Sequence, residues 1–98
     1  MAGQVGSEER IILTDVLDKN GISVTWFRIG GYREDCRCLE EVDGEFQVYT
    51  AFRNDKVNLT CYQQKDDAIK AFIRSLTYDE VKTQKIYDEF VDALERDE

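Results

Sequence analysis

Asp43-Gly44 constrains the fold of this chain more than any other pair of residues, because it separates two runs in which apolar and polar residues alternate. An Asp-Gly pair favours a two-residue β-hairpin turn, since both central positions of that turn take positive φ. The alternation of the flanking runs has the period of two that a half-buried strand requires. The sequence therefore predicts a hairpin that pairs residues 36–42 with residues 45–53.

A second turn is predicted at Asn54-Asp55, and a third alternating run over residues 57–62 comes after it. Asparagine and aspartate favour turns because their short side chains hydrogen-bond to the local backbone. The three strands thus form an antiparallel meander with one apolar face, which needs a cover. The strand side chains predicted to lie in the core are Phe46, Val48, Phe52 and Leu59.

Helical periodicity marks one segment before the meander and one after it. Residues 8–20 and residues 66–76 repeat apolar positions at helical spacing and begin with acidic residues, which the helix dipole stabilises in the first turn. Ser7 is the predicted N-cap of the first helix, and Gly21 comes after its end, as is common at helix C-termini. The apolar residues predicted to face the core are Ile11, Ile12, Val16 and Leu17 in the first helix and Ala68, Ile69, Phe72, Ile73 and Leu76 in the second.

A third helix is predicted at the end of the chain. Its start is indicated by a capping box that runs from Thr77 to Glu80, in which threonine caps the helix and glutamate reaches back to the cap. The helix is predicted to run to about Glu95. Its expected apolar stripe is Val81, Ile86, Phe90, Val91 and Leu94.

Residues 22–29 are rich in β-branched and aromatic side chains and predict a further strand, which Gly30-Gly31 ends. The predicted order of elements is then α-β-β-β-β-α-α. This order indicates an α+β fold with a four-stranded antiparallel sheet, one N-terminal helix and two C-terminal helices. We expect residues 1–98 to form a single domain in which residues 1–6 are disordered.

The composition narrows the possible partners and the compartment. The chain has 13 basic and 21 acidic residues and no histidine, which gives a net charge of −8. Nucleic acids and anionic membranes need a basic surface, so neither is an expected partner. An odd number of cysteines, with no signal-peptide core and no apolar run long enough to span a membrane, predicts a cytoplasmic protein without disulfides.

Residues able to carry catalysis or to bind a metal are few. Without histidine, the common general base and the imidazole metal ligand are both missing. Cys36, Cys38 and Cys61 would supply three thiolates, but a structural zinc site takes four ligands, so buried free thiols are the preferred interpretation. Adjacent acids such as Glu40-Glu41 point to opposite faces of a strand and do not converge on a substrate. We predict no catalytic residue, no metal and no cofactor.

Several segments carry a resemblance to a known family. They are Phe27-Arg28-Ile29-Gly30-Gly31, Cys38-Leu39-Glu40, the run from Val42 to Tyr49, Leu59-Thr60-Cys61-Tyr62 and Asp66-Asp67-Ala68. In these segments, which cover about half of it, the chain resembles the small immunity proteins of bacterial polymorphic and contact-dependent toxin systems. The resemblance implies a helix, a short strand that ends in a double glycine, a meander and an acidic-capped helix. It also implies a stoichiometric protein inhibitor with no enzymatic activity.

Two acidic patches are the candidate contacts with such a partner. Carboxylates of both patches are expected to steer a basic partner, and a tyrosine anchor is expected in the loop patch alone. The favoured patch lies in the loop after Gly31, and the alternative lies on the last helix. The residues are Tyr32, Glu34 and Asp35 in the loop, and Asp88, Asp92 and Glu95 in the helix.

The expected function is therefore that of an immunity protein, which binds and neutralises a cognate toxin. A nuclease is the expected toxin, because a cleft that holds phosphate must be positive. The alternative is an acidic mimic of nucleic acid, such as a phage-encoded inhibitor of a host nuclease complex. Both readings predict an acidic surface directed at a basic protein, and the sequence does not separate them.

Overall fold

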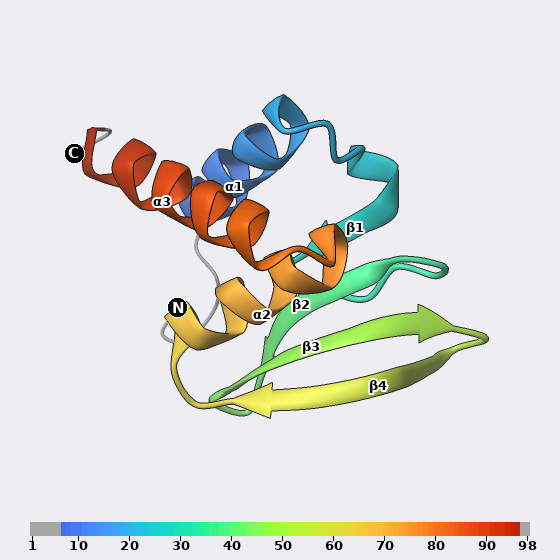
Figure 1. Ribbon diagram of the computed structural model, residues 1–98. Coiled ribbons are helices and arrows are strands. Elements are labelled where there is room, and N and C mark those ends of the chain that lie inside the picture. Colours follow the sequence, from blue (N-terminus) through green and yellow to red (C-terminus); the bar gives the residue numbers. More distant parts are fainter. Residues whose placement is uncertain (1–6, 97–98) are drawn as a thin grey trace.

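The computed structural model describes residues 7–96, and over these residues the predicted α+β class and order of elements are confirmed (Figure 1). The elements are α1 (Ser7–Lys19), the 3₁₀ turn η1 (Val24–Trp26), β1 (Phe27–Ile29), β2 (Arg37–Val42), β3 (Glu45–Phe52), β4 (Asp55–Tyr62), α2 (Lys65–Thr77) and α3 (Glu80–Arg96). Residues 1–6, for which disorder was predicted, lie outside the described part. No helix in that part is long and apolar enough to cross a membrane.

The predicted hairpin at Asp43-Gly44 is confirmed. Both residues have positive φ, 51° and 85°, and β2 pairs with β3 in antiparallel register across the turn. The next turn lies one residue earlier than predicted, because Arg53 and Asn54 take the positive φ values and Asp55 already begins β4. The strands β2, β3 and β4 thus form the expected antiparallel meander.

The prediction of a fully antiparallel sheet is wrong at β1, which pairs with β2 in parallel. The strand predicted over residues 22–29 is only three residues long, because its first half is the turn η1. The Ser23 hydroxyl accepts a hydrogen bond from the amide of Thr25 at 3.2 Å, and such local bonds compete with strand pairing. After Gly30 the chain returns through a loop and then enters β2 in the same direction as β1.

At β2 and β3 the sheet has buried residues on both faces, although the sequence predicted one core face, whereas β4 is largely exposed. Alternate residues of β2 and β3 enter two separate clusters, with Leu39 and Val48 on the helix side and Cys38 and Tyr49 on the other. The helix-side cluster is the main core. The second cluster consists of Cys36, Cys38, Tyr49 and Ala51.

Two side chains predicted to be buried, Phe52 and Leu59, are exposed. The ladder between β3 and β4 shifts register near Asn58, which has a φ of 56°. An extra residue in one strand reverses which face the following side chains occupy, so Leu59 leaves the helix side of the sheet. Phe52 is the last residue of β3 and lies against the guanidinium of Arg53, 5.1 Å from its ring centre.

The three helices form two layers over the same face of the sheet (Figure 1). α2 contacts β2, β3 and β4 directly, and its predicted buried residues Ala68, Ile69, Phe72 and Ile73 are confirmed. α3 packs on α1 and α2, so it lies farthest from the sheet. Asn20, just after α1, donates a hydrogen bond from Nδ2 to Glu89 Oε1 of α3 at 2.8 Å.

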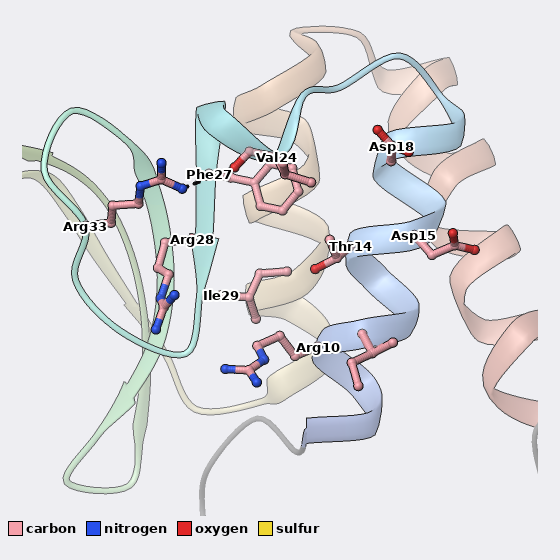
Figure 2. Close-up of a pocket in the computed structure, with 10 residues that line it drawn as sticks. Arg10, Thr14, Asp15, Asp18, Val24, Phe27, Arg28, Ile29 and Arg33 are labelled. Carbon is pink, nitrogen blue, oxygen red and sulfur yellow. Dashed lines mark hydrogen bonds between the residues drawn. The ribbon is translucent and has the colours of Figure 1, made fainter.

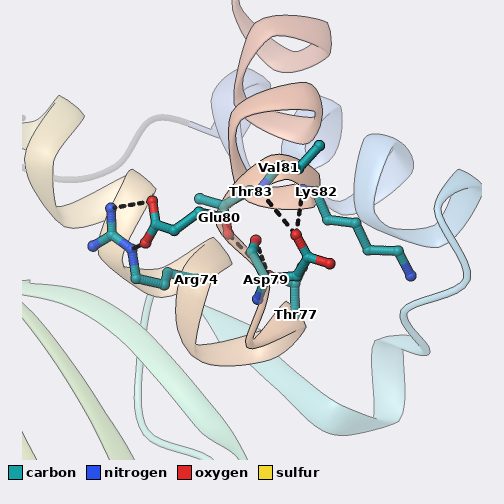
Figure 3. A network of polar contacts seen from close by, with 7 residues as sticks. All are labelled: Arg74, Thr77, Asp79, Glu80, Val81, Lys82 and Thr83. Atoms are coloured by element: carbon teal, nitrogen blue, oxygen red, sulfur yellow. Dashed lines mark hydrogen bonds and ion pairs between the residues drawn. The ribbon is translucent and has the colours of Figure 1, made fainter.

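Figure 3 shows the elbow between α2 and α3, where the predicted capping box is wrong. Thr77 is the last residue of α2, and Tyr78 ends that helix with a left-handed φ of 55°. Asp79 is the true cap of α3, since its Oδ1 accepts hydrogen bonds from the amides of Val81 at 2.8 Å and Lys82 at 3.1 Å. The Thr77 hydroxyl instead contacts the amide of Asp79 at 3.2 Å.

Candidate interaction surface

The loop between β1 and β2, which held the favoured candidate residues, is packed against the sheet. The ring of Tyr32 stacks on the ring of Tyr49, with 6.1 Å between the ring centres. Because Tyr49 alternates with the core residue Val48, this contact places the loop on the face opposite the helices. The amide of Asp35 also donates to the carbonyl of Ala51 at 2.7 Å, so the loop extends the sheet ladder.

Glu34 holds the loop to the turn between β3 and β4. Its Oε1 accepts hydrogen bonds from the Tyr32 hydroxyl at 2.7 Å and from the amide of Asn54 at 3.1 Å. Its Oε2 accepts a third from the amide of Arg53. These residues do lie together, as predicted. The expectation that charge reversal at Glu34 leaves the fold intact is not supported, because the carboxylate binds two backbone amides.

The electrostatics of this cluster keep its groups in fixed protonation states. Partial burial, with a contribution from the hydrogen bond to Glu34, raises the pKa of Tyr32 to about 12. The hydrogen bonds from Tyr32 and the turn amides lower the pKa of the Glu34 carboxyl. Tyr32 is therefore a neutral donor and Glu34 an ionised acceptor at neutral pH. Neither group is poised for proton transfer in that range.

The three cysteines are free and do not form one site. Cys36 and Cys38 are buried under the loop, whereas Cys61 is exposed on β4. Burial raises the pKa of the Cys38 thiol, and a hydrogen bond to Glu45 raises that of Cys61. A thiol with a raised pKa is a poor nucleophile and metal ligand at neutral pH. Within residues 7–96, no group of three or more cysteine and acidic side chains is arranged to hold a metal.

The helix patch lies on one side of α3. Asp88, Asp92 and Glu95 are spaced i, i+4 and i+7, which aligns them on one face of a helix, away from the buried Ile86 and Phe90. The Asp88 carboxylate accepts a hydrogen bond from Gln84 at 2.8 Å, and that of Asp92 pairs with Arg96 at 3.2 Å. Both contacts are exposed, so they leave the carboxylates accessible to a partner.

One further residue extends this patch and was missed by the sequence interpretation. Val81 was predicted to be buried, but it is 80% exposed. Val81 lies seven residues before Asp88 and so shares its face of the helix. The spacing of Val81 could have indicated its exposure, because a residue five positions before Ile86 does not share the face of Ile86. Thr83, three positions before Ile86, occupies that core position and is buried. We define the α3 outer face as Val81, Asp88, Asp92 and Glu95.

The two predicted patches lie on opposite sides of the molecule. The loop covers the outer face of the sheet, whereas α3 is the layer farthest from the sheet on the other side. Comparison with protein-family models, with curated proteins and with solved structures found no match to the chain. A single flat partner surface would contact one patch or the other.

Proposed function

We propose that this protein is a stoichiometric inhibitor that binds a basic protein partner through the α3 outer face, as an immunity protein binds its toxin. The observation that carries the proposal is the exposed apolar side chain of Val81, which shares one face of a packed helix with three exposed carboxylates. Exposed apolar side chains on a rigid element mark protein interfaces when charged groups surround them. The carboxylates add charge complementarity to a basic partner.

The structural role of the loop favours the helix over the loop as the contact surface. Tyr32 and Glu34 are already engaged with Tyr49 and with the β3–β4 turn. A partner that took over these groups would break hydrogen bonds on which the turn depends, at a cost in free energy. The carboxylates on α3 are engaged only in exposed contacts, and a partner displaces such contacts at little cost.

Charge reversal on α3 tests this proposal. We expect Asp88→Lys, Asp92→Lys to weaken binding to the cognate toxin at least about tenfold, because charges that attract the basic partner then repel it. Val81→Ser should weaken binding through loss of an apolar anchor, with no change in net charge. Binding is measured by titration calorimetry against the product of a neighbouring toxin gene in its inactivated form, and protection by co-expression.

Two variants serve as matched controls. Glu45→Lys reverses an exposed charge at the start of β3, outside the α3 outer face, and should leave binding within about threefold of the unmodified protein, as surface charges outside an interface do. Asp35→Lys reverses a charge in the loop without removing the Glu34 hydrogen bonds. Full protection by the α3 variants together with loss of protection by Asp35→Lys would move the interface to the loop. Failure of the unmodified protein to bind any neighbouring gene product would reject the immunity function.

A further inference from the structure

An open groove lies between α1 and the segment formed by η1 and β1, and three arginines line it (Figure 2). Its volume is about 730 Å³, which is within the range of ligand-binding clefts. We call it the arginine groove and define it by Arg10 on α1, Arg28 on β1 and Arg33 in the following loop. The groove is disjoint from the α3 outer face.

The three arginines have no carboxylate partner among residues 7–96. Two other arginines of the chain do form ion pairs, Arg74 with Glu80 and Arg96 with Asp92. In a chain with 21 acidic residues, three neighbouring guanidinium groups without a carboxylate are unexpected. Each group presents donors in a planar fork that matches a carboxylate, so the groove offers binding sites for anions.

The guanidinium groups are spread along the groove rather than gathered at one point. The side chain of Arg10 lies beside Gly30, where an added Cβ would be 3.8 Å from its Cδ. Arg33 lies at the other end of β1, with its Nη1 3.5 Å from the Val24 carbonyl. At about 3.3 Å per strand residue, the two end residues of β1 are about 7 Å apart. Figure 2 shows Arg28 between them.

The remaining lining is mainly apolar. Ile11 is 64% exposed and Val24 47% exposed, although both were predicted to pack in the core or the sheet, and the buried Phe27 and Ile29 form the inner wall. Exposed aliphatic side chains beside unpaired cations suit a ligand that carries both carboxylates and apolar groups. One carboxylate in the lining, that of Asp15, is paired with Lys19 at 3.1 Å.

We propose that the arginine groove binds an extended acidic segment of a partner protein. Carboxylates of that segment pair with Arg10, Arg28 and Arg33, and the apolar side chains between them pack on Ile11 and Val24. In an extended peptide, alternate side chains on one side are about 6–7 Å apart, which matches a row of guanidinium groups better than a single phosphate does. Asp18 in the lining and the net charge of −8 disfavour a continuous polyanion such as nucleic acid.

Fluorescence anisotropy with a defined probe tests this inference. The probe is a short fluorescein-labelled peptide in which glutamate alternates with valine, and the matched control peptide has glutamine in place of glutamate. The full chain should bind the glutamate peptide and bind the glutamine peptide at least about tenfold more weakly. Arg10→Gln and Arg28→Gln should each weaken binding of the glutamate peptide about tenfold, because each removes a charge-assisted pair.

Lys82→Gln is the control variant, because it removes one exposed positive charge on α3, outside the groove. It should bind the peptide as the unmodified protein does. In NMR spectra, the amides of Gly30 and Gly31 should shift on titration with the glutamate peptide. The proposal would be overturned if the protein bound the two peptides with equal affinity, or if Lys82→Gln and Arg10→Gln lost the same amount of affinity. It would also be overturned if millimolar inorganic phosphate displaced the peptide and the peptide left the Gly30 and Gly31 amide shifts unchanged.

Discussion

Glu34 joins two parts of the molecule that are far apart in the sequence, the loop after β1 and the turn between β3 and β4. Its carboxylate accepts hydrogen bonds from Tyr32 in its own loop and from the amides of Arg53 and Asn54. Both turn residues have positive φ, a conformation that costs free energy for residues other than glycine. We infer that the Glu34 carboxylate stabilises this turn by satisfying the amides that the turn leaves without strand partners.

The acid stability of the protein should therefore depend on Glu34. Because the pKa of Glu34 is lowered in the folded state, its contribution is present above the unfolded pKa of about 4.3 and is lost as pH falls through the folded pKa. Glu34→Gln should lower the free energy of unfolding at pH 7, and the difference from the unmodified protein should shrink below about pH 4. Urea denaturation from pH 3 to pH 7 measures both quantities.

Asp35→Asn is the matched control, since it removes the neighbouring charge. The Asp35 side chain accepts no hydrogen bond within the described part of the chain, whereas its backbone amide does bond to Ala51. The unfolding free energy of Asp35→Asn should therefore equal that of the unmodified protein, or differ from it by a constant amount, across this pH range. A pH-independent difference between Glu34→Gln and the unmodified protein would contradict the proposed role of the charge.

Single residues at the surface were the hardest to predict from the sequence. An apolar side chain is expected to be buried, but Val81 and Leu59 are exposed because their positions in the helix and in the strand point away from the core. Leu59 changes face because of the irregularity near Asn58, and this one asparagine, a residue type that tolerates positive φ, is a weak mark of that irregularity in the sequence. Val81 is exposed because Thr83 takes the core position, and a threonine is not read as a core residue. Val81, which extends the candidate surface, was missed for this reason.

At the scale of elements, the start of α3 depends on one carboxylate. Asp79 Oδ1 accepts from two of the amides that the first helical turn leaves unpaired. Asp79→Ala should therefore destabilise the protein by about 1 kcal/mol, the usual cost of losing an aspartate cap. Urea denaturation at pH 7 measures this change. Asp88→Ala, an exposed change within the same helix, should cost much less, and a cost equal to that of Asp79→Ala would argue against the cap.

The elements themselves were predictable where local chemistry decides them. The Asp43-Gly44 hairpin and the helix over Lys65–Thr77 follow from turn residues and periodicity. The parallel orientation of β1 was not predictable, because it depends on the path of the loop that follows, which stacks Tyr32 on Tyr49 on the outer face of the sheet. This contact joins a loop residue to a residue of β3, and a single sequence contains no signal for it.

At the scale of the whole molecule, the fold separates surfaces of different charge. The α3 outer face carries carboxylates on the layer farthest from the sheet, whereas the arginine groove lies beside β1. This separation permits one partner to contact both sites only if it wraps around α1. The net charge predicted an acidic surface. It gave no indication of the groove, because Arg10, Arg28 and Arg33 are separated in the sequence and line one groove only in the folded chain.

The net charge of −8 also sets how a basic partner approaches. Long-range attraction acts mainly on the association rate, and salt screens it over about 8 Å at physiological ionic strength. If the α3 outer face binds a basic toxin, raising salt should slow association more than it speeds dissociation. Asp88→Lys, Asp92→Lys should make association less sensitive to salt, because it removes the carboxylates nearest the partner. Stopped-flow kinetics from low to high salt measure both rates, and a salt effect confined to dissociation would exclude steering by this face.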